Sequence, residues 1–175
     1  MRVLRDHGDA AEPHFRLLNG AMAAPCMHAG GLLASSQTTA SWVAELRPNA
    51  IRHWVTGTAA PCTSLFKPVR VDEPLDLGAA PTDRYDTSSL WWRHEHLHRQ
   101  VLRDPARLRL LFVAERDAVE ARWRAEPPEP RSAFGEGDRL LAEWTARVTE
   151  AAGPDTRPRF VRSYWRVRDQ RAAIP

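Results

Sequence analysis

Apolar and polar residues alternate in the first half of the chain, from Thr38 to Leu46. A period of two places every second side chain on the same face, which is typical of a half-buried β-strand. Residues 47–49 predict a turn, and Ile51–Thr56 then predicts the returning strand of a hairpin. Thr63–Val71 also has an extended pattern, and Pro68 within it indicates an edge or a bend.

The second half has the periodicity of amphipathic helices. Leu90–Leu102 carries an apolar stripe, and Pro105–Ala125 predicts a second helix because proline is favoured in a first turn. Asp138–Ala152 and Arg159–Ala172 predict the third and last helices. Between the two halves, residues 72–89 are rich in Pro, Gly, Asp and Thr, and they predict a long loop.

The order of these elements predicts the fold class. Antiparallel strands in residues 1–71 and helices in residues 90–175 indicate an α+β fold. A chain of 175 residues fits a single domain. No apolar run approaches the roughly 20 residues that a transmembrane helix needs, and residues 1–19 are too charged for a signal peptide. We therefore expect a cytoplasmic protein that does not enter membranes.

Composition limits the partners that we expect. The formal net charge is +3, which is too small to predict nucleic-acid binding. Residues 157–171 interleave arginines with aromatic residues, but an amphipathic helix with its arginines toward water explains this better than stacking on bases. Cys26 and Cys62 are the only cysteines, so we expect thiols rather than a disulfide framework. Without a CxxC pair, a structural zinc site has little support.

Several motifs resemble those of one known family. They are CMHAGG at Cys26–Gly31, SQTTASWVAEL at Ser36–Leu46 and HWVTGTAAPCTSLFKPV at His53–Val69, with VLRDHG at Val3–Gly8 before them and LWWRHEHLHRQVLRD at Leu90–Asp104 after them. Together they resemble the secernin family of dipeptidases, which are N-terminal-nucleophile hydrolases. The match covers most of this chain and corresponds to the C-terminal part of a family member.

The resemblance implies a fold and a reaction. The fold would be part of an αββα sandwich, in which two sheets lie between two helical layers. The reaction would be hydrolysis of the amide bond of a small peptide, without a metal or an organic cofactor. The family's nucleophile is a cysteine at a free amino terminus, where the α-amino group acts as the base. Met1 and Arg2 stand at that place here, so we expect no activity unless an N-terminal partner supplies the nucleophile.

The motifs also suggest substrate-binding residues, which are polar and lie at turns or strand ends. They are His28, Gln37, Thr38, Thr39, Thr56, Thr58, Cys62 and Ser64. Such groups can hold a peptide or support an oxyanion, but they can equally satisfy backbone groups at turns. A partial sandwich would expose an apolar sheet face, so we expect a homo-oligomer or a hetero-oligomer.

Two other functions fit the sequence. Residues 94–98 read HEHLH, which matches the HExxH pattern of zinc metallopeptidases. On a helix the outer histidines would share a face and Glu95 would serve as general base, with Glu115 or Glu120 as a third ligand. Short motifs match by chance, and we favour simple packing of both histidines. The other alternative is a non-catalytic interaction module derived from an inactive hydrolase.

Overall fold

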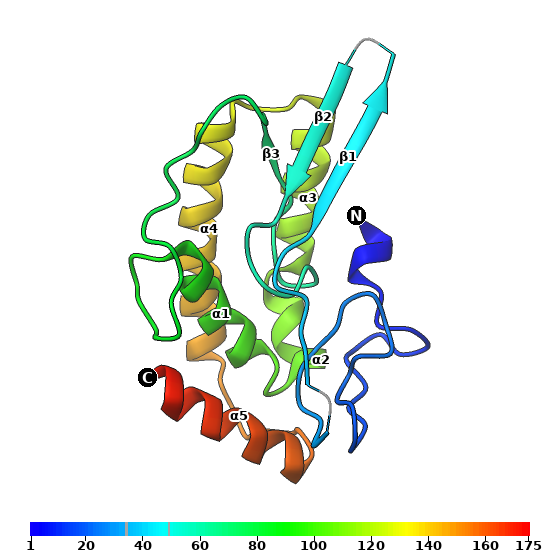
Figure 1. Cartoon of the computed structure of the whole chain (residues 1–175), viewed down its shortest axis with the longest axis vertical. Helices are drawn as coiled ribbons and strands as arrows, with labels where there is room; N and C mark the ends of the chain where they lie inside the picture. The colour runs from blue at the N-terminus through cyan, green and yellow to red at the C-terminus, as the bar shows by residue number, and fades with distance from the viewer. Residues whose placement is uncertain (34, 49) are drawn as a thin grey trace.

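The strands of the first half form one antiparallel sheet in the computed structural model, which describes residues 1–33, 35–48 and 50–175. In sheet order, the strands are β1 (Trp42–Arg47), β2 (Ala50–Val55) and β3 (Lys67–Val69). The β1–β2 hairpin projects past the ends of the helices (Figure 1). The turn predicted over residues 47–49 includes Asn49, which lies outside the described residues.

Strand β1 begins at Trp42 rather than at Thr38, where the alternation starts. Thr38 pairs with loops instead of with β2, because its backbone N–H donates to the carbonyl of Met27 and its carbonyl accepts from Ala60. The alternating pattern therefore predicts an extended chain correctly, but only the part from Trp42 onward pairs with a neighbouring strand.

The second half is helical, as predicted. Its helices are α1 (Leu90–Val101), α2 (Pro105–Leu108), α3 (Val113–Ala125), α4 (Pro130–Glu150) and α5 (Arg159–Ala172), and the short 3-10 turns are η1 (Arg2–Arg5) and η2 (Arg109–Leu111). Helices α3 and α4 lie side by side, α1 packs against α4, and α5 crosses their lower end (Figure 1). The bounds of α5 match the prediction, and the α+β class is confirmed.

The helix predicted over Pro105–Ala125 is broken into three pieces. Phe112 has φ −145° and ψ −13°, and this non-helical residue separates η2 from α3. Its ring is buried and stacks on Trp144 with 5.0 Å between ring centroids. The apolar periodicity is compatible with one long helix, but packing of the Phe112 ring into the core requires a break.

Helix α4 begins at Pro130, eight residues before the predicted start at Asp138. Proline occupies the first turn of the helix, where its missing N–H costs nothing. Gly137 inside this helix permits a close approach, because a Cβ at this position would lie 3.3 Å from Cδ of Lys67 on β3. Gly137 therefore has a packing role.

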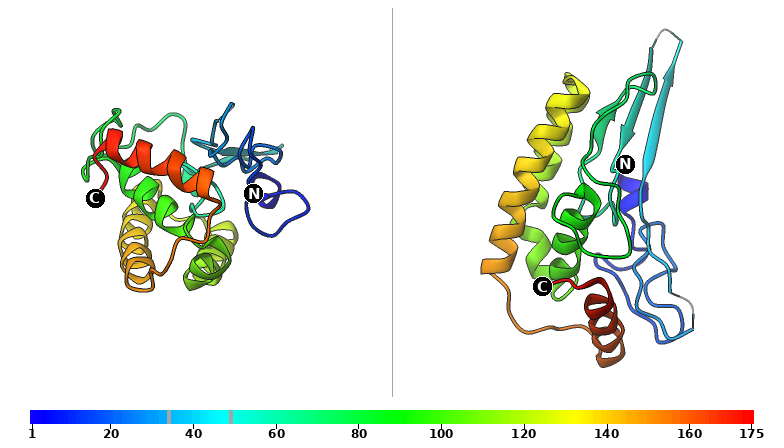
Figure 2. Two further views of the ribbon diagram at one scale, coloured as in Figure 1. Left: turned by 90° about the horizontal axis from the view of Figure 1, so that it is seen from below. Right: turned by 60° about the vertical axis from the view of Figure 1, so that its left-hand side comes forward.

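The main core lies between these helices and the sheet. Buried side chains from α1, α3 and α4 meet Trp54 of β2 and Phe66, which precedes β3. By contrast, the described residues between η1 and β1 form turns and isolated bridges rather than helices or strands. Figure 2 shows this N-terminal segment on the side of the molecule away from α4. Backbone hydrogen bonds from Thr56 to Ser41 and from Ala60 to Thr38 tie the end of this segment to the rest of the chain.

One face of the β1–β2 hairpin is apolar and open to solvent. Trp42, Leu46 and Ile51 share this face and are 61%, 76% and 63% exposed. The oligomer predicted from an uncovered sheet stays a prediction, as does the two-sheet sandwich, because the described residues form a single sheet. Among the described helices, none has the length and apolar character needed to cross a membrane.

Candidate metal centre

Four metal-binding side chains from separate segments converge beside helix α1. They are His7, Cys26, His28 and Cys62, and their ligand atoms all lie within 4.8 Å of one another. Cys26, His28 and Cys62 are buried, whereas His7 is half-buried. Among the described residues this is the only such cluster of histidine, cysteine and carboxylate groups.

The CMHAGG motif places two of these side chains on the same side of an extended segment. Cys26 and His28 are two residues apart, and His28 pairs with Ala21 in an isolated bridge. Gly20 has φ +60°, and a Cβ there would lie 2.9 Å from the backbone nitrogen of Gly30. Glycine is required at this position because two backbone segments touch. Trp165 of α5 fixes the same motif by donating its indole N–H to the carbonyl of Ala29 at 3.1 Å.

The Nε2 atom of His28 is the hub of the cluster. It lies 3.2 Å from Nε2 of His7, 3.4 Å from Sγ of Cys26 and 3.5 Å from Sγ of Cys62. A tetrahedral zinc ion with Zn–N near 2.0–2.1 Å and Zn–S near 2.3 Å separates its ligands by roughly 3.3 Å for N···N and roughly 3.6 Å for N···S. The three distances are therefore close to those that one tetrahedral zinc ion would impose on its ligands.

Hydrogen-bond partners fix the tautomer of His28. Nδ1 of His98 lies 3.0 Å from a carboxylate oxygen of Glu95, which only accepts, so this nitrogen carries a proton. When His98 is neutral, its Nε2 accepts from Nδ1 of His28, 3.1 Å away, whereas a protonated His98 would donate to His28 instead. With both histidines neutral, the Nε2 atom of His28, which faces the rest of the cluster, has no proton and presents a lone pair.

The same reasoning applies to His7. Its Nδ1 lies 3.1 Å from the carbonyl oxygen of Ala11, which also only accepts. In its neutral form His7 therefore presents a second lone pair on Nε2, directed at that of His28. Two lone pairs at hydrogen-bond distance repel each other unless a metal ion or a proton lies between them. Burial opposes a proton on His7, but interactions with Cys62 and Ala11 outweigh it and raise the pKa of His7. A single imidazole nitrogen also cannot make hydrogen bonds to three neighbours at once.

The electrostatic environment favours the ligand forms of His28 and Cys26, but it disfavours the thiolate of Cys62. Burial lowers the pKa of His28 and keeps its imidazole neutral. A hydrogen bond with Cys62 lowers the pKa of the Cys26 thiol, and the same bond together with burial raises the pKa of Cys62. Burial opposes the charge on Glu95, but His98 and Arg99 outweigh it and lower its pKa to about 2. The carboxylate that orients His98 is therefore ionised.

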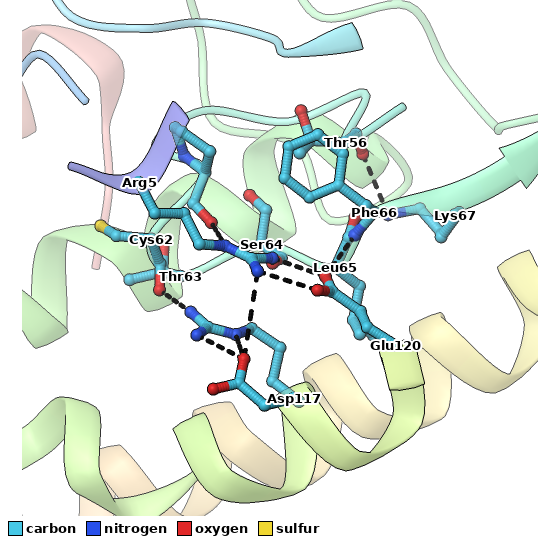
Figure 3. Close-up of polar contacts among 12 residues, drawn as sticks. Arg5, Thr56, Cys62, Thr63, Ser64, Leu65, Phe66, Lys67, Asp117 and Glu120 are labelled. Carbon is cyan, nitrogen blue, oxygen red and sulfur yellow. Dashed lines mark hydrogen bonds and ion pairs between the residues drawn. The ribbon is translucent and has the colours of Figure 1, made fainter. Parts of the chain in front are cut away.

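A buried ion pair holds the segments that carry His7 and Cys62 (Figure 3). Arg5 donates to Glu120 of α3 at 2.8 Å, and to the carbonyls of Pro61 and Ser64 at 2.7 and 2.9 Å. Glu120 also accepts from the backbone N–H of Phe66 at 2.8 Å. Arg5 thus connects the start of the chain to the loop between β2 and β3.

Two of the predicted substrate-binding residues, His28 and Cys62, belong to the cluster, and a third supports it. Gln37 donates its side-chain amide to both oxygens of Glu95, at 3.2 and 3.3 Å. The hydroxyl of Thr38 accepts a hydrogen bond from the backbone N–H of Met27. The backbone carbonyl of Thr39 accepts one from the indole N–H of Trp91.

The remaining predicted residues form a separate buried network. Oγ1 of Thr58 lies 2.8 Å from Oγ of Ser64, which lies 3.0 Å from Nε2 of His94. Thr56 hydrogen-bonds to the backbone of Ser41 and Thr58. These hydroxyls form hydrogen bonds with the backbone of turns and with one buried histidine. This is the packing role that the sequence also allowed for them.

The HEHLH string does not form a zinc site of the HExxH type. His94 faces Ser64 and Thr63, whereas both ring nitrogens of His98 are engaged, one by Glu95 and the other by His28. The proposed third ligands are also committed elsewhere, Glu120 to Arg5 and Glu115 to Trp144 and Arg147. The motif instead contacts the cluster from behind, because His98 lies against His28 and Glu95 lies against His98.

Sequence reasoning missed His7 and Cys26 as candidate ligands. The expectation of no metal rested on the absence of a CxxC pair and on the family resemblance. The structure removes the first ground, because the candidate ligands come from three separate segments. The available signal was the Cys-x-His spacing at Cys26 and His28, which places both side chains on one side of an extended chain.

Comparisons with known proteins found no match among protein-family models, curated proteins or solved structures. The secernin resemblance therefore stays a prediction, and the geometry of the centre is what bears on function.

Proposed function

We propose that this chain is a zinc-binding domain in which His7, Cys26, His28 and Cys62 hold one Zn²⁺ ion. The supporting observation is that the Nε2 atoms of His7 and His28 face each other at 3.2 Å beside two thiols. Two imidazoles and two thiolates are a common tetrahedral zinc set.

The layer of residues behind the ligands is also typical of metal sites. A ligand histidine usually donates its other ring N–H to a carboxylate, a carbonyl or water. Here His7 donates to the carbonyl of Ala11, and His28 donates to His98, which in turn donates to Glu95. Each histidine is thereby held with its lone pair toward the proposed ion.

The ion would serve as a crosslink for the N-terminal segment. This segment has little regular secondary structure, and the ligands join it to the loop that precedes β3. A metal bound only by the folded chain contributes its binding energy to folding. At free zinc 1,000-fold above the dissociation constant, the gain is about 4 kcal/mol, or roughly 10 °C in melting temperature for a chain of this size.

Metal analysis of the purified and zinc-reconstituted protein tests this proposal. We expect one zinc per chain, and zinc-edge X-ray absorption should show two sulfur and two nitrogen ligands. Cys26→Ser and Cys62→Ser should each lose the metal and the zinc-dependent rise in melting temperature. His14→Ala, a nearby histidine outside the ligand set, is the matched control. Less than a tenth of an equivalent of zinc, or unchanged binding in both serine variants, would overturn the proposal.

A second candidate is a part in secernin-type hydrolysis of small peptides. The observation that favours it is convergence, because every segment that carries the resemblance contributes to one network. The contributing side chains are His7, Cys26, His28, Gln37, Cys62, Glu95 and His98. The α+β arrangement, with its helices and a single described sheet, would then be part of the larger αββα sandwich.

Both thiols of the chain lie buried within the centre, so neither is free to act as the nucleophile. A second polypeptide would have to supply it. Assays with dipeptides should therefore show no turnover by this chain alone and turnover when a complementary N-terminal half is added. Turnover by the chain alone that is abolished by a chelator would instead favour a zinc peptidase. Absence of turnover with every complementary half would favour a binding module.

A further inference from the structure

A cavity of about 350 Å³ lies directly against the proposed zinc centre. His7 and Cys26 form part of its wall, and Asp9, His14 and Arg16 form another part. The last three residues are exposed, so the cavity connects the centre with solvent. The other two proposed ligands do not line the cavity, which therefore meets the centre from one side only.

The ligands differ in how firmly they are held. His28 is 0% exposed and is oriented by the hydrogen-bonded pair His98 and Glu95 inside the protein. His7 is half-buried and lies between the exposed residues Asp6 and Gly8. Among the described residues, its one hydrogen-bond partner outside the cluster is the carbonyl of Ala11. Release of His7 from the ion would disturb few other contacts. Of the two ligands that line the cavity, the half-buried His7 is thus more easily displaced than the buried Cys26.

We propose that the zinc centre has one exchangeable position, at which a small oxygen-donor ligand enters from the cavity and replaces His7. This inference rests on the proposed zinc site. The remaining set of Cys26, His28 and Cys62 with one open position is a donor set found in catalytic zinc sites. In the exchange, the Zn–N bond to His7 breaks as an oxygen lone pair of the entering ligand forms a Zn–O bond. The oxidation state of zinc does not change.

The chemistry of the cavity indicates the class of ligand. Two thiolates neutralise the charge of Zn²⁺, so an entering anion needs a further positive group, and the exposed guanidinium of Arg16 on the cavity wall provides one. A volume of about 350 Å³ is at the small end of the range for ligand sites. A small carboxylate or hydroxamate, up to the size of an amino acid or a dipeptide, fits these conditions.

Cobalt substitution tests the exchange, because the visible absorption of Co²⁺ reports its ligands. We expect acetohydroxamate to change the spectrum of the Co²⁺ protein in a saturable way, with Co²⁺ remaining bound to the protein after gel filtration. His7→Ala should bind acetohydroxamate at least tenfold more tightly, because no protein ligand has to leave. Arg16→Ala should weaken acetohydroxamate binding about tenfold without altering the spectrum before addition. His14→Ala should leave that initial spectrum unchanged as well.

The results separate the two proposals. Failure of the wild-type protein to bind Co²⁺ or Zn²⁺ would overturn the zinc site itself. A tetrahedral Co²⁺ spectrum that acetohydroxamate leaves unchanged in the wild-type protein would overturn the exchangeable position and leave the zinc site standing. If acetohydroxamate instead removes Co²⁺ from the protein, this result would also contradict the exchangeable position, because the proposal requires the ion to stay bound. If His7→Ala does not hold Co²⁺, the wild-type titration decides the question alone.

Discussion

Nδ1 of His28 lies 3.1 Å from Nε2 of His98, and this contact joins the proposed metal centre to helix α1. Both side chains are 0% exposed. Because Glu95 fixes the proton on the far side of His98, the contact also determines which nitrogen of His28 faces the ion. Helix α1 therefore positions a ligand without itself carrying one.

We predict that His98→Ala lowers zinc affinity by about 10- to 100-fold, the usual cost of removing a partner behind a ligand histidine. Competition with a chromophoric chelator measures this affinity. His96→Ala is the matched control, because His96 lies on the same helix but belongs to no metal-binding cluster among the described residues. Equal affinities for the two variants would contradict the role of His98.

We predict that Arg5→Ala lowers the free energy of unfolding by about 3 kcal/mol. Arg5 and Glu120 are 11% and 5% exposed, and removing one partner leaves an uncompensated buried charge. Chemical denaturation measures the change. Arg139→Ala breaks the exposed Arg139–Glu143 pair, which should contribute less than about 1 kcal/mol. A similar loss in both variants would show that burial of the Arg5 pair is unimportant.

We predict that Lys67 makes the protein more stable as pH rises from about 8 toward 10.5. Burial lowers the pKa of Lys67 from 10.5 to about 8, so in this window the unfolded chain binds more protons than the folded chain. Raising the pH removes those protons and stabilises the folded state, by up to about 3 kcal/mol over the full window. Lys67 is the only lysine of the chain.

The comparison that isolates this effect is wild type against Lys67→Met, by denaturation at several values of pH. The difference in stability between the two proteins should change across the window from about 8 to 10.5 and be constant between pH 6 and pH 7. A difference that does not vary with pH would mean that the buried amine has an ordinary pKa.

We predict that the exposed face of the β1–β2 hairpin supports self-association or association with another chain. Trp42 and Leu46 are more than half exposed on the same face. If the protein self-associates, light scattering of the wild type should give a mass above that of one chain, and Leu46→Lys should reduce it. Leu110→Lys, at an exposed leucine of η2, is the control. A monomer at high concentration, with no binding to a complementary half, would contradict the prediction.

The sequence by itself determined the elements whose periodicity is local. The hairpin strands follow from apolar residues at every second position, and the bounds of α5 follow from apolar residues at every third or fourth position. In both cases the spacing decides which side of the element is apolar. Phe112 shows where such reasoning ends. A ring that must reach Trp144, 32 positions later, breaks a helix that the local pattern would continue.

The tertiary structure alone decided the candidate site. The sequence marked His28, Cys62 and the HEHLH string as unusual. It assigned His28 and Cys62 to a peptide-binding surface, and it favoured simple packing of the HEHLH histidines over a zinc motif. His7 and Cys62 are 55 positions apart, and nothing in the local pattern indicates that both contact His28. Their meeting depends on the Arg5–Glu120 pair and on packing of the loop before β3, which are long-range contacts. The role of a polar side chain depends on the atoms that face it, and only the folded chain brings those atoms together.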